Sequence, residues 1–67
     1  MQVLTITKEG LNLNPRSAKN IIVWNALKSA FEHTLTGTIT VLEATAITSS
    51  CPYYVGYAVR RGWLAAF

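Results

Sequence analysis

Three tyrosines and two adjacent arginines lie within one short segment near the end of the sequence, "SSCPYYVGYAVRRGWL", residues 49–64. Arginine pairs with phosphate or guanine through parallel hydrogen bonds, and a phenol can donate to phosphate or stack on a base. The same two residue types are enriched at the energetic centres of protein–protein interfaces. The chemistry that this segment favours is therefore recognition of a nucleic acid or of another protein.

The segment divides into two faces when it is drawn as a helix. One face is expected to point to the core: Val55, Ala58, Val59 and Gly62. The opposite face is expected to point outward, with Gly56 beside it: Tyr53, Tyr57, Arg60, Leu64 and, at the border, Arg61. Exposed tyrosines leave apolar surface in water, so a merely solvated helix would carry Glu and Lys instead. We therefore expect a contact surface made of these residues: Ser50, Tyr53, Tyr57, Arg60 and Arg61.

A second interpretation of this segment stays open. Tyr53 and Tyr57 would then pack under the N-terminal strand, and the two arginines would simply be solvated. Trp63 also has two interpretations. It either anchors the end of a sheet against the first long helix or lies exposed as an interface anchor.

No set of side chains typical of an enzyme is present. His33 is the only histidine, and no nucleophile or orienting partner for it can be recognised. Cys51 is the only cysteine, which excludes a disulfide within the chain and a zinc site made of several thiolates. The glutamates are scattered: Glu9, Glu32 and Glu43. We expect a protein that acts by binding, with no catalytic residue, no metal and no cofactor.

The composition is that of one small, mildly basic folded domain. The 67 residues are 51% hydrophobic and 13% charged, which is too apolar for a disordered chain. A formal net charge of +3 suits a polyanionic partner, although many small proteins are mildly basic for solubility alone. The first residues lack the pattern of a secretory signal, and the longest uncharged stretch, 44–59, contains a turn. We expect a cytoplasmic protein that does not enter a membrane.

The first half of the chain predicts a strand and a long helix. A run of β-forming residues indicates a strand over 2–8. "LNLNPRS" predicts the start of a helix over 15–33, with Asn14 or Ser17 as its cap and Pro15 in its first turn. The apolar residues of that helix share one side at helical spacing: Val23, Trp24, Leu27, Ala30 and Phe31. This helix is expected to be the main core helix.

The second half predicts shorter elements. "GTIT" can form a very short strand, and "TVLE" has the form of a capping box that begins a helix over 41–47. "TSSCP" then indicates a tight turn and a third helix over 51–61, with Pro52 in its first turn. A last strand is expected over 63–67.

This order of elements resembles the winged helix-turn-helix fold of bacterial and phage regulators. In that family a core helix is followed by a short strand, two helices, and a glycine with an apolar pair that begins the wing. Here "GTIT" corresponds to the short strand, "TVLEATAI" to the second helix, "SSCPYYVGYAVRR" to the recognition helix and "GWLAAF" to the first wing strand. The resemblance covers residues 17–67 and implies binding to duplex DNA.

The sequence departs from the family's pattern at the wing. The chain stops at Phe67, which leaves no residues for the returning strand of a hairpin, and the third helix reaches Gly62 sooner than is usual in the family. Pairing of "QVLTITK" with "GWLAAF" would complete a small sheet from the two chain ends. We therefore expect one α/β (α+β) winged-helix-like domain over 1–67, with three helices, a truncated wing and weak DNA affinity as a monomer.

Two functions of different classes fit these expectations. The first is a DNA-binding regulator of transcription, in which Arg60 and Arg61 meet phosphate or guanine and Ser50, Tyr53 and Tyr57 make supporting contacts. The second is a small phage-type viral protein for host takeover, which would inhibit a host nucleic-acid machine such as a polymerase or a defence complex through the same face. The apolar composition and the truncated wing also favour a homodimer, because two weak sites bind more strongly together.

Overall fold

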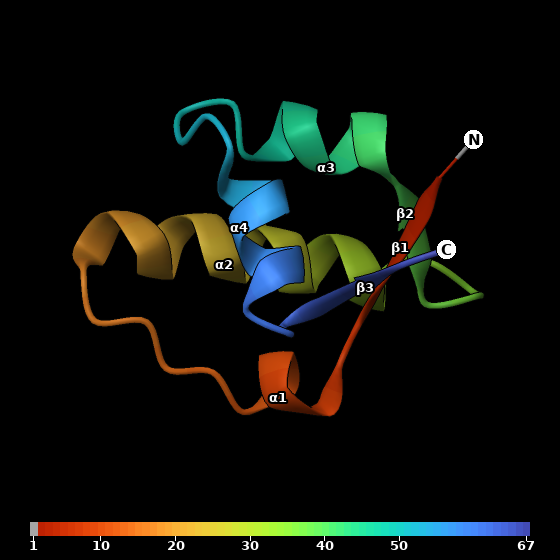
Figure 1. Ribbon diagram of the computed structural model, residues 1–67, viewed down its shortest axis with the longest axis horizontal. Coiled ribbons are helices and arrows are strands. Elements are labelled where there is room, and N and C mark those ends of the chain that lie inside the picture. Colours follow the sequence, from red (N-terminus) through yellow and green to blue (C-terminus); the bar gives the residue numbers. More distant parts are fainter. Residues whose placement is uncertain (1) are drawn as a thin grey trace.

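Both ends of the chain contribute strands to one three-stranded antiparallel sheet (Figure 1). The structure is a computed structural model that describes residues 2–67. The strand order is β2-β1-β3, so β1 (Val3–Ile6) lies between β2 (Thr38–Thr40) and β3 (Leu64–Ala66). The predicted pairing of the two chain ends is confirmed, because β1 and β3 pair directly.

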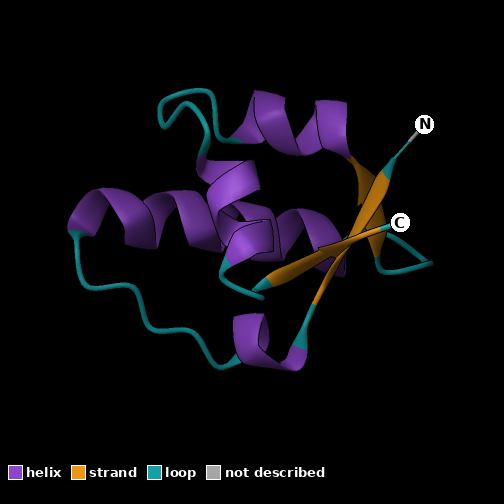
Figure 2. Ribbon diagram, viewed as in Figure 1, coloured by secondary structure: helices purple, strands orange, loops and turns teal. Residues whose placement is uncertain are grey.

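The rest of the fold is helical, and the molecule has an α+β architecture. The helices are α1 (Lys8–Leu11), α2 (Ala18–Glu32), α3 (Val41–Ile47) and α4 (Tyr54–Arg60). Figure 2 shows the strands gathered at one end of the molecule with the long helix α2 running away from them. The expectation of three helices missed α1. This short helix forms because the Thr7 hydroxyl caps it by accepting a hydrogen bond from the Gly10 amide over 3.1 Å.

The start of α2 differs from the prediction. The helix begins at Ala18, because the Ser17 hydroxyl accepts a hydrogen bond from the Asn20 amide over 3.1 Å and so fixes Ser17 as the cap. Pro15 therefore lies before the helix and not in its first turn. The predicted alternative of Ser17 as cap is confirmed.

The predicted capping box of α3 is confirmed in both of its hydrogen bonds. The Thr40 hydroxyl accepts from the Glu43 amide over 3.1 Å, and the Glu43 carboxylate accepts from the Thr40 amide over 3.1 Å. Because Thr40 is also the last residue of β2, strand and helix follow each other without a loop. This junction fixes where α3 lies relative to the sheet.

The core forms where α2 packs against the sheet and the two following helices. Its buried residues include all the expected apolar positions of α2 except Ala30, which is half-buried. The buried hydrophobic residues are Leu4, Val23, Trp24, Leu27, Phe31, Ile39, Ala44, Tyr54, Ala58 and Leu64. The expectation that Leu64 lies on the outward face of the third helix is therefore wrong, because Leu64 begins β3 and is buried. Full burial of one large apolar side chain stabilises a fold by about 1.5 to 3 kcal/mol. This single core holds α3 and α4 in place above α2.

Candidate nucleic-acid interface

The turn between α3 and α4 delays the start of α4. The Cys51 amide donates to the Thr48 carbonyl over 2.8 Å, and the Tyr54 amide donates to the Cys51 carbonyl over 3.1 Å. Tyr53 has a φ of 70°, in the left-handed region, so the helix cannot extend back through it. The prediction of a helix beginning at 51, with Pro52 in its first turn, is therefore wrong.

Two of the predicted contact residues, Ser50 and Tyr53, consequently lie on this turn instead of on the helix. Both are exposed, and Tyr53 is 90% exposed. A left-handed backbone costs a residue other than glycine about 1 to 2 kcal/mol. Since Tyr53 buries almost none of its side chain, the interpretation in which it packs under the N-terminal strand is wrong. Its phenol faces solvent, where a partner can reach it.

The buried face of α4 consists of Tyr54 and Ala58. The Tyr54 ring reaches α2, where its centroid lies 6.4 Å from that of Trp24. Burial raises the pKa of the Tyr54 phenol, and its neighbours Cys51 and Tyr57 add to this shift. Tyr54 is therefore a neutral core residue of the fold.

The predicted core face of this helix is confirmed at Ala58, and in part at Val55 and Val59, which pack against the edge of the core. Val55 and Val59 are half-buried, and Gly62 is exposed with a φ of 84°. Gly62 follows the end of α4 and turns the chain toward β3 in a conformation that glycine adopts without strain. The later start of the helix lets the large ring of Tyr54 take the central buried position instead.

Tyr57, Arg61 and Trp63 form a group that we call the aromatic cluster. The rings of Tyr57 and Trp63 meet edge to face, with centroids 5.5 Å apart and an interplanar angle of 82°. The guanidinium carbon of Arg61 lies 5.7 Å from the centre of the Trp63 ring. Trp63 also meets Trp24 of α2 at 6.1 Å, which confirms that it anchors the start of the last strand against the long helix. Tyr57 remains 43% exposed, so this cluster is partly open to solvent.

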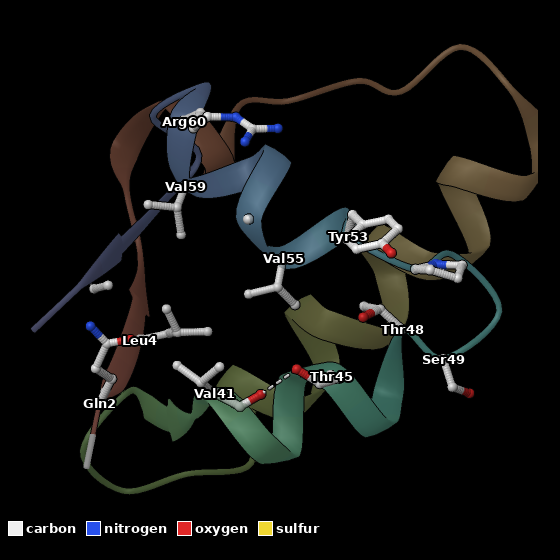
Figure 3. A pocket seen from close by; sticks show the side chains of 13 residues that line it. Gln2, Leu4, Val41, Thr45, Thr48, Ser49, Tyr53, Val55, Val59 and Arg60 are labelled. Carbon is white, nitrogen blue, oxygen red and sulfur yellow. Dashed lines mark hydrogen bonds between the residues drawn. The ribbon is translucent and has the colours of Figure 1, made fainter.

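A groove of about 860 Å³ opens between α3, α4 and the sheet on the other flank of α4 (Figure 3). Its lining residues are Gln2, Leu4, Val41, Thr45, Thr48, Ser49, Pro52, Tyr53, Val55, Gly56, Val59, Arg60 and Ala66. Arg60 lies at the rim, where its guanidinium points away from the floor at Leu4. The predicted contact face is thus divided in two. Tyr53 and Arg60 border the groove, whereas Tyr57 and Arg61 belong to the aromatic cluster.

The groove walls were not predicted from the sequence. Val41 and Thr45 lie one turn apart on α3, and Val55 and Val59 lie one turn apart on α4. Two such pairs on neighbouring helices were a signal in the sequence, because residues four apart share a helix face. We expected Val55 and Val59 in a closed core, whereas they are half-buried along an open groove.

Cationic side chains outnumber acidic ones in the α3 to α4 segment. Arg60 and Arg61 are exposed and adjacent at the end of α4. The acidic residue of the segment, Glu43, is held by Thr40, whose amide and hydroxyl donate to its carboxylate over 3.1 Å and 3.0 Å. Two cations on one helix end favour an anionic partner.

Two other features bear on the kind of site. Within residues 2–67, no group of three or more His, Cys, Asp or Glu side chains lies close enough to hold a metal ion. His33 caps the end of α2, with its Nδ1 atom 2.7 Å from the Ser29 carbonyl oxygen. Over the same described residues, none of the helices combines the length and the apolar character needed to cross a bilayer.

Comparisons of the chain with protein-family models, with curated proteins and with solved structures found no match. The candidate sites of this chain are the two surfaces that flank α4. These are the groove and the aromatic cluster.

Proposed function

We propose that this protein is a small DNA-binding regulator without catalytic activity, and that it places α4 against duplex DNA. The observation that carries the proposal is the pair Arg60 and Arg61, both exposed at the end of a helix that follows α3 and a tight turn. In helix-turn-helix proteins the second helix enters the major groove. Guanidinium groups at that helix can pair with phosphate oxygens or with guanine.

We further propose that the domain has a winged-helix arrangement. The order α2, β2, α3, α4 and β3 is the one that the family resemblance implies. The central strand β1 pairs with both β2 and β3, so the N-terminal segment takes the sheet position that a returning wing strand would need. In this proposal the sheet supports α4, and no phosphate contact is assigned to a wing.

The turn supplies the remaining contacts of the proposed interface. Ser50 and Tyr53 are exposed just before α4, where a hydroxyl and a phenol can donate hydrogen bonds to phosphate. Tyr57, which is 43% exposed, belongs to the aromatic cluster with Arg61 and can contact DNA from there. With so few cationic contacts, one copy binds DNA weakly, and we propose that two copies act together as a homodimer.

The direct test is binding of the full chain to a random duplex, measured by fluorescence anisotropy at low salt. We expect measurable binding that falls at least tenfold in the double variant Arg60→Gln with Arg61→Gln, since each phosphate contact supports non-specific affinity. A matched control removes the same charge elsewhere, as Lys8→Gln with Lys28→Gln on α1 and α2. Equal loss in both double variants would mean that net charge, and not α4, governs binding.

A second candidate function is supported by exposed apolar residues on the same segment. Leu42 on α3 is 76% exposed and Tyr53 on the turn is 90% exposed. Such residues suit a protein partner, as in a phage-type effector that inhibits a host nucleic-acid machine. If the wild-type chain does not bind DNA at low salt, this candidate takes the place of the first. Tyr53→Ala is then expected to weaken the protein complex by about 1 to 3 kcal/mol.

A further inference from the structure

The groove beside α4 has an apolar lining that can accept an apolar group of a ligand. Leu4 is 1% exposed and forms part of the floor, while Val41 from α3 and Val55 and Val59 from α4 form the walls. Figure 3 shows these side chains converging on one space. The three valines are half-buried, so each leaves apolar surface uncovered. The volume of about 860 Å³ falls in the range of sites that hold small organic ligands, roughly 300 to 1,000 Å³.

The two threonine hydroxyl groups that α3 and its C-terminal cap place in the wall offer little polar recognition. The Thr45 hydroxyl donates to the Val41 carbonyl over 2.8 Å, and the Thr48 hydroxyl donates to the Ala44 carbonyl over 2.9 Å. Both hydroxyl hydrogens are therefore used within α3. A ligand in contact with these residues meets methyl groups and oxygens that are already hydrogen-bonded, so the walls favour a molecule whose buried part is apolar.

The charged side chain of the groove lies at its rim. Among the described residues that line it, Arg60 is the charged one. Its side chain is exposed, and rotation about its flexible stem can direct the guanidinium toward or away from the opening. A carboxylate at this rim can accept two parallel hydrogen bonds from one guanidinium group. The charge of the site is thus complementary to an anion at one end of an apolar molecule.

We propose that this groove binds a small amphipathic carboxylic acid. Its apolar chain lies between Val41, Val55 and Val59, and its carboxylate meets Arg60 at the rim. This ligand site goes beyond DNA binding and does not depend on it. The binding is tested on the protein alone, so that a failure of either proposal can be recognised separately.

Gly56 provides a way to close the groove without harming the fold. It lines the groove in the middle of α4, with helical backbone geometry, and a Cβ atom added there would meet no atom within 4 Å. Glycine in a helix interior costs about 1 kcal/mol relative to alanine. The Gly56→Leu substitution should therefore fill part of the groove while the fold stays at least as stable.

The experiment titrates the full-length ¹⁵N-labelled protein with decanoate and follows amide chemical shifts. We expect saturable shifts concentrated at Val41, Val55, Gly56 and Val59, and their loss in Gly56→Leu. Arg60→Gln should weaken decanoate binding about five- to tenfold, as expected for loss of a charge-assisted contact. Arg61→Gln is the matched control, because Arg61 carries the same charge one residue away and lies on the aromatic cluster.

Decyltrimethylammonium, which has the same chain length and the opposite charge, serves as the second probe. It should bind at least tenfold more weakly than decanoate. Equal binding of the two probes, shifts located away from the groove, or unchanged decanoate binding in Gly56→Leu would each overturn the proposal. Loss of affinity in Arg61→Gln equal to that in Arg60→Gln would also overturn it, because the carboxylate would then sense only net charge.

Discussion

The guanidinium carbon of Arg61 lies 5.7 Å from the centre of the Trp63 ring, and this contact separates the roles of two neighbouring arginines. Arg61 is held against an aromatic ring that itself packs on α2, whereas Arg60 extends from the groove rim. One cation is thus positioned before a partner arrives, and the other can move.

This difference predicts unequal effects of the two arginines on stability. Arg61→Gln should lower the free energy of unfolding by about 0.5 to 1 kcal/mol, because a cation over an exposed aromatic ring contributes that amount. Arg60→Gln should lower it by less, because Arg60 in the last turn of α4 interacts with the helix dipole but has no aromatic ring beneath its guanidinium. Urea denaturation followed by circular dichroism measures both values. Equal stability of the two variants would show that the contact with Trp63 has no energetic effect.

Two glycines provide a contrasting prediction about packing. A Cβ atom at Gly10 would overlap the Trp63 carbonyl oxygen, which also accepts a hydrogen bond from the Thr7 amide. Gly10→Ala should therefore destabilise the fold by about 1 to 3 kcal/mol. Gly56→Ala, which meets open space on α4, should stabilise it by about 1 kcal/mol. Thermal unfolding of the two variants should shift in opposite directions, and a shift in the same direction would contradict the described packing around α1.

Tyr53 should be separable from fold stability. Asparagine tolerates the left-handed backbone better than tyrosine does, and a side chain that is 90% exposed contributes little packing. Tyr53→Asn should keep or slightly raise the melting temperature while it weakens binding of the partner of α4. Calorimetry and the DNA-binding assay provide the two measurements. A large drop in melting temperature would show that the phenol supports the fold.

The buried phenol of Tyr54 predicts a loss of stability in alkaline solution. Burial raises its pKa above the ordinary value of 10.0, so the unfolded chain loses this proton at lower pH than the folded one. The associated stability is present below pH 10.0 and declines as pH rises from there through the folded pKa. Tyr54→Phe should remove this decline, whereas Tyr57→Phe should weaken it only in part, because burial raises the pKa of Tyr54 more than Tyr57 does. Urea denaturation at a series of alkaline pH values tests the pair.

Local signals predicted most elements of this fold. The capping box of "TVLE" sets α3 through hydrogen bonds between residues three apart, and Ser17 caps α2 in the same local way. The pairing of the chain ends was also predicted, from the β-forming runs "QVLTITK" and "GWLAAF", whereas the pairing of β1 with β2 was not. Hydrogen bonds between near neighbours, and runs of β-forming residues, are the features that one sequence can reveal.

The surface around α4 was predicted less well for a physical reason. A single left-handed residue, Tyr53, moved the start of the helix, and a helical wheel drawn from 51 could not include that turn. Tyr54 entered the core because Trp24 lies within reach of its ring, which is a contact between distant residues. The groove likewise depends on the distance between α3 and α4, and one sequence does not contain that distance.

The central claim is that Arg60 and Arg61 bring α4 to DNA, and the salt dependence of binding tests it most directly. The affinity of the full chain for a random duplex is measured over a series of salt concentrations. The slope of the logarithm of affinity against the logarithm of salt should be shallower by about 1.8 in the Arg60→Gln, Arg61→Gln double variant, since each lost phosphate contact removes about 0.9. An unchanged slope in a folded double variant, or no binding of the wild-type chain at low salt, would contradict the claim.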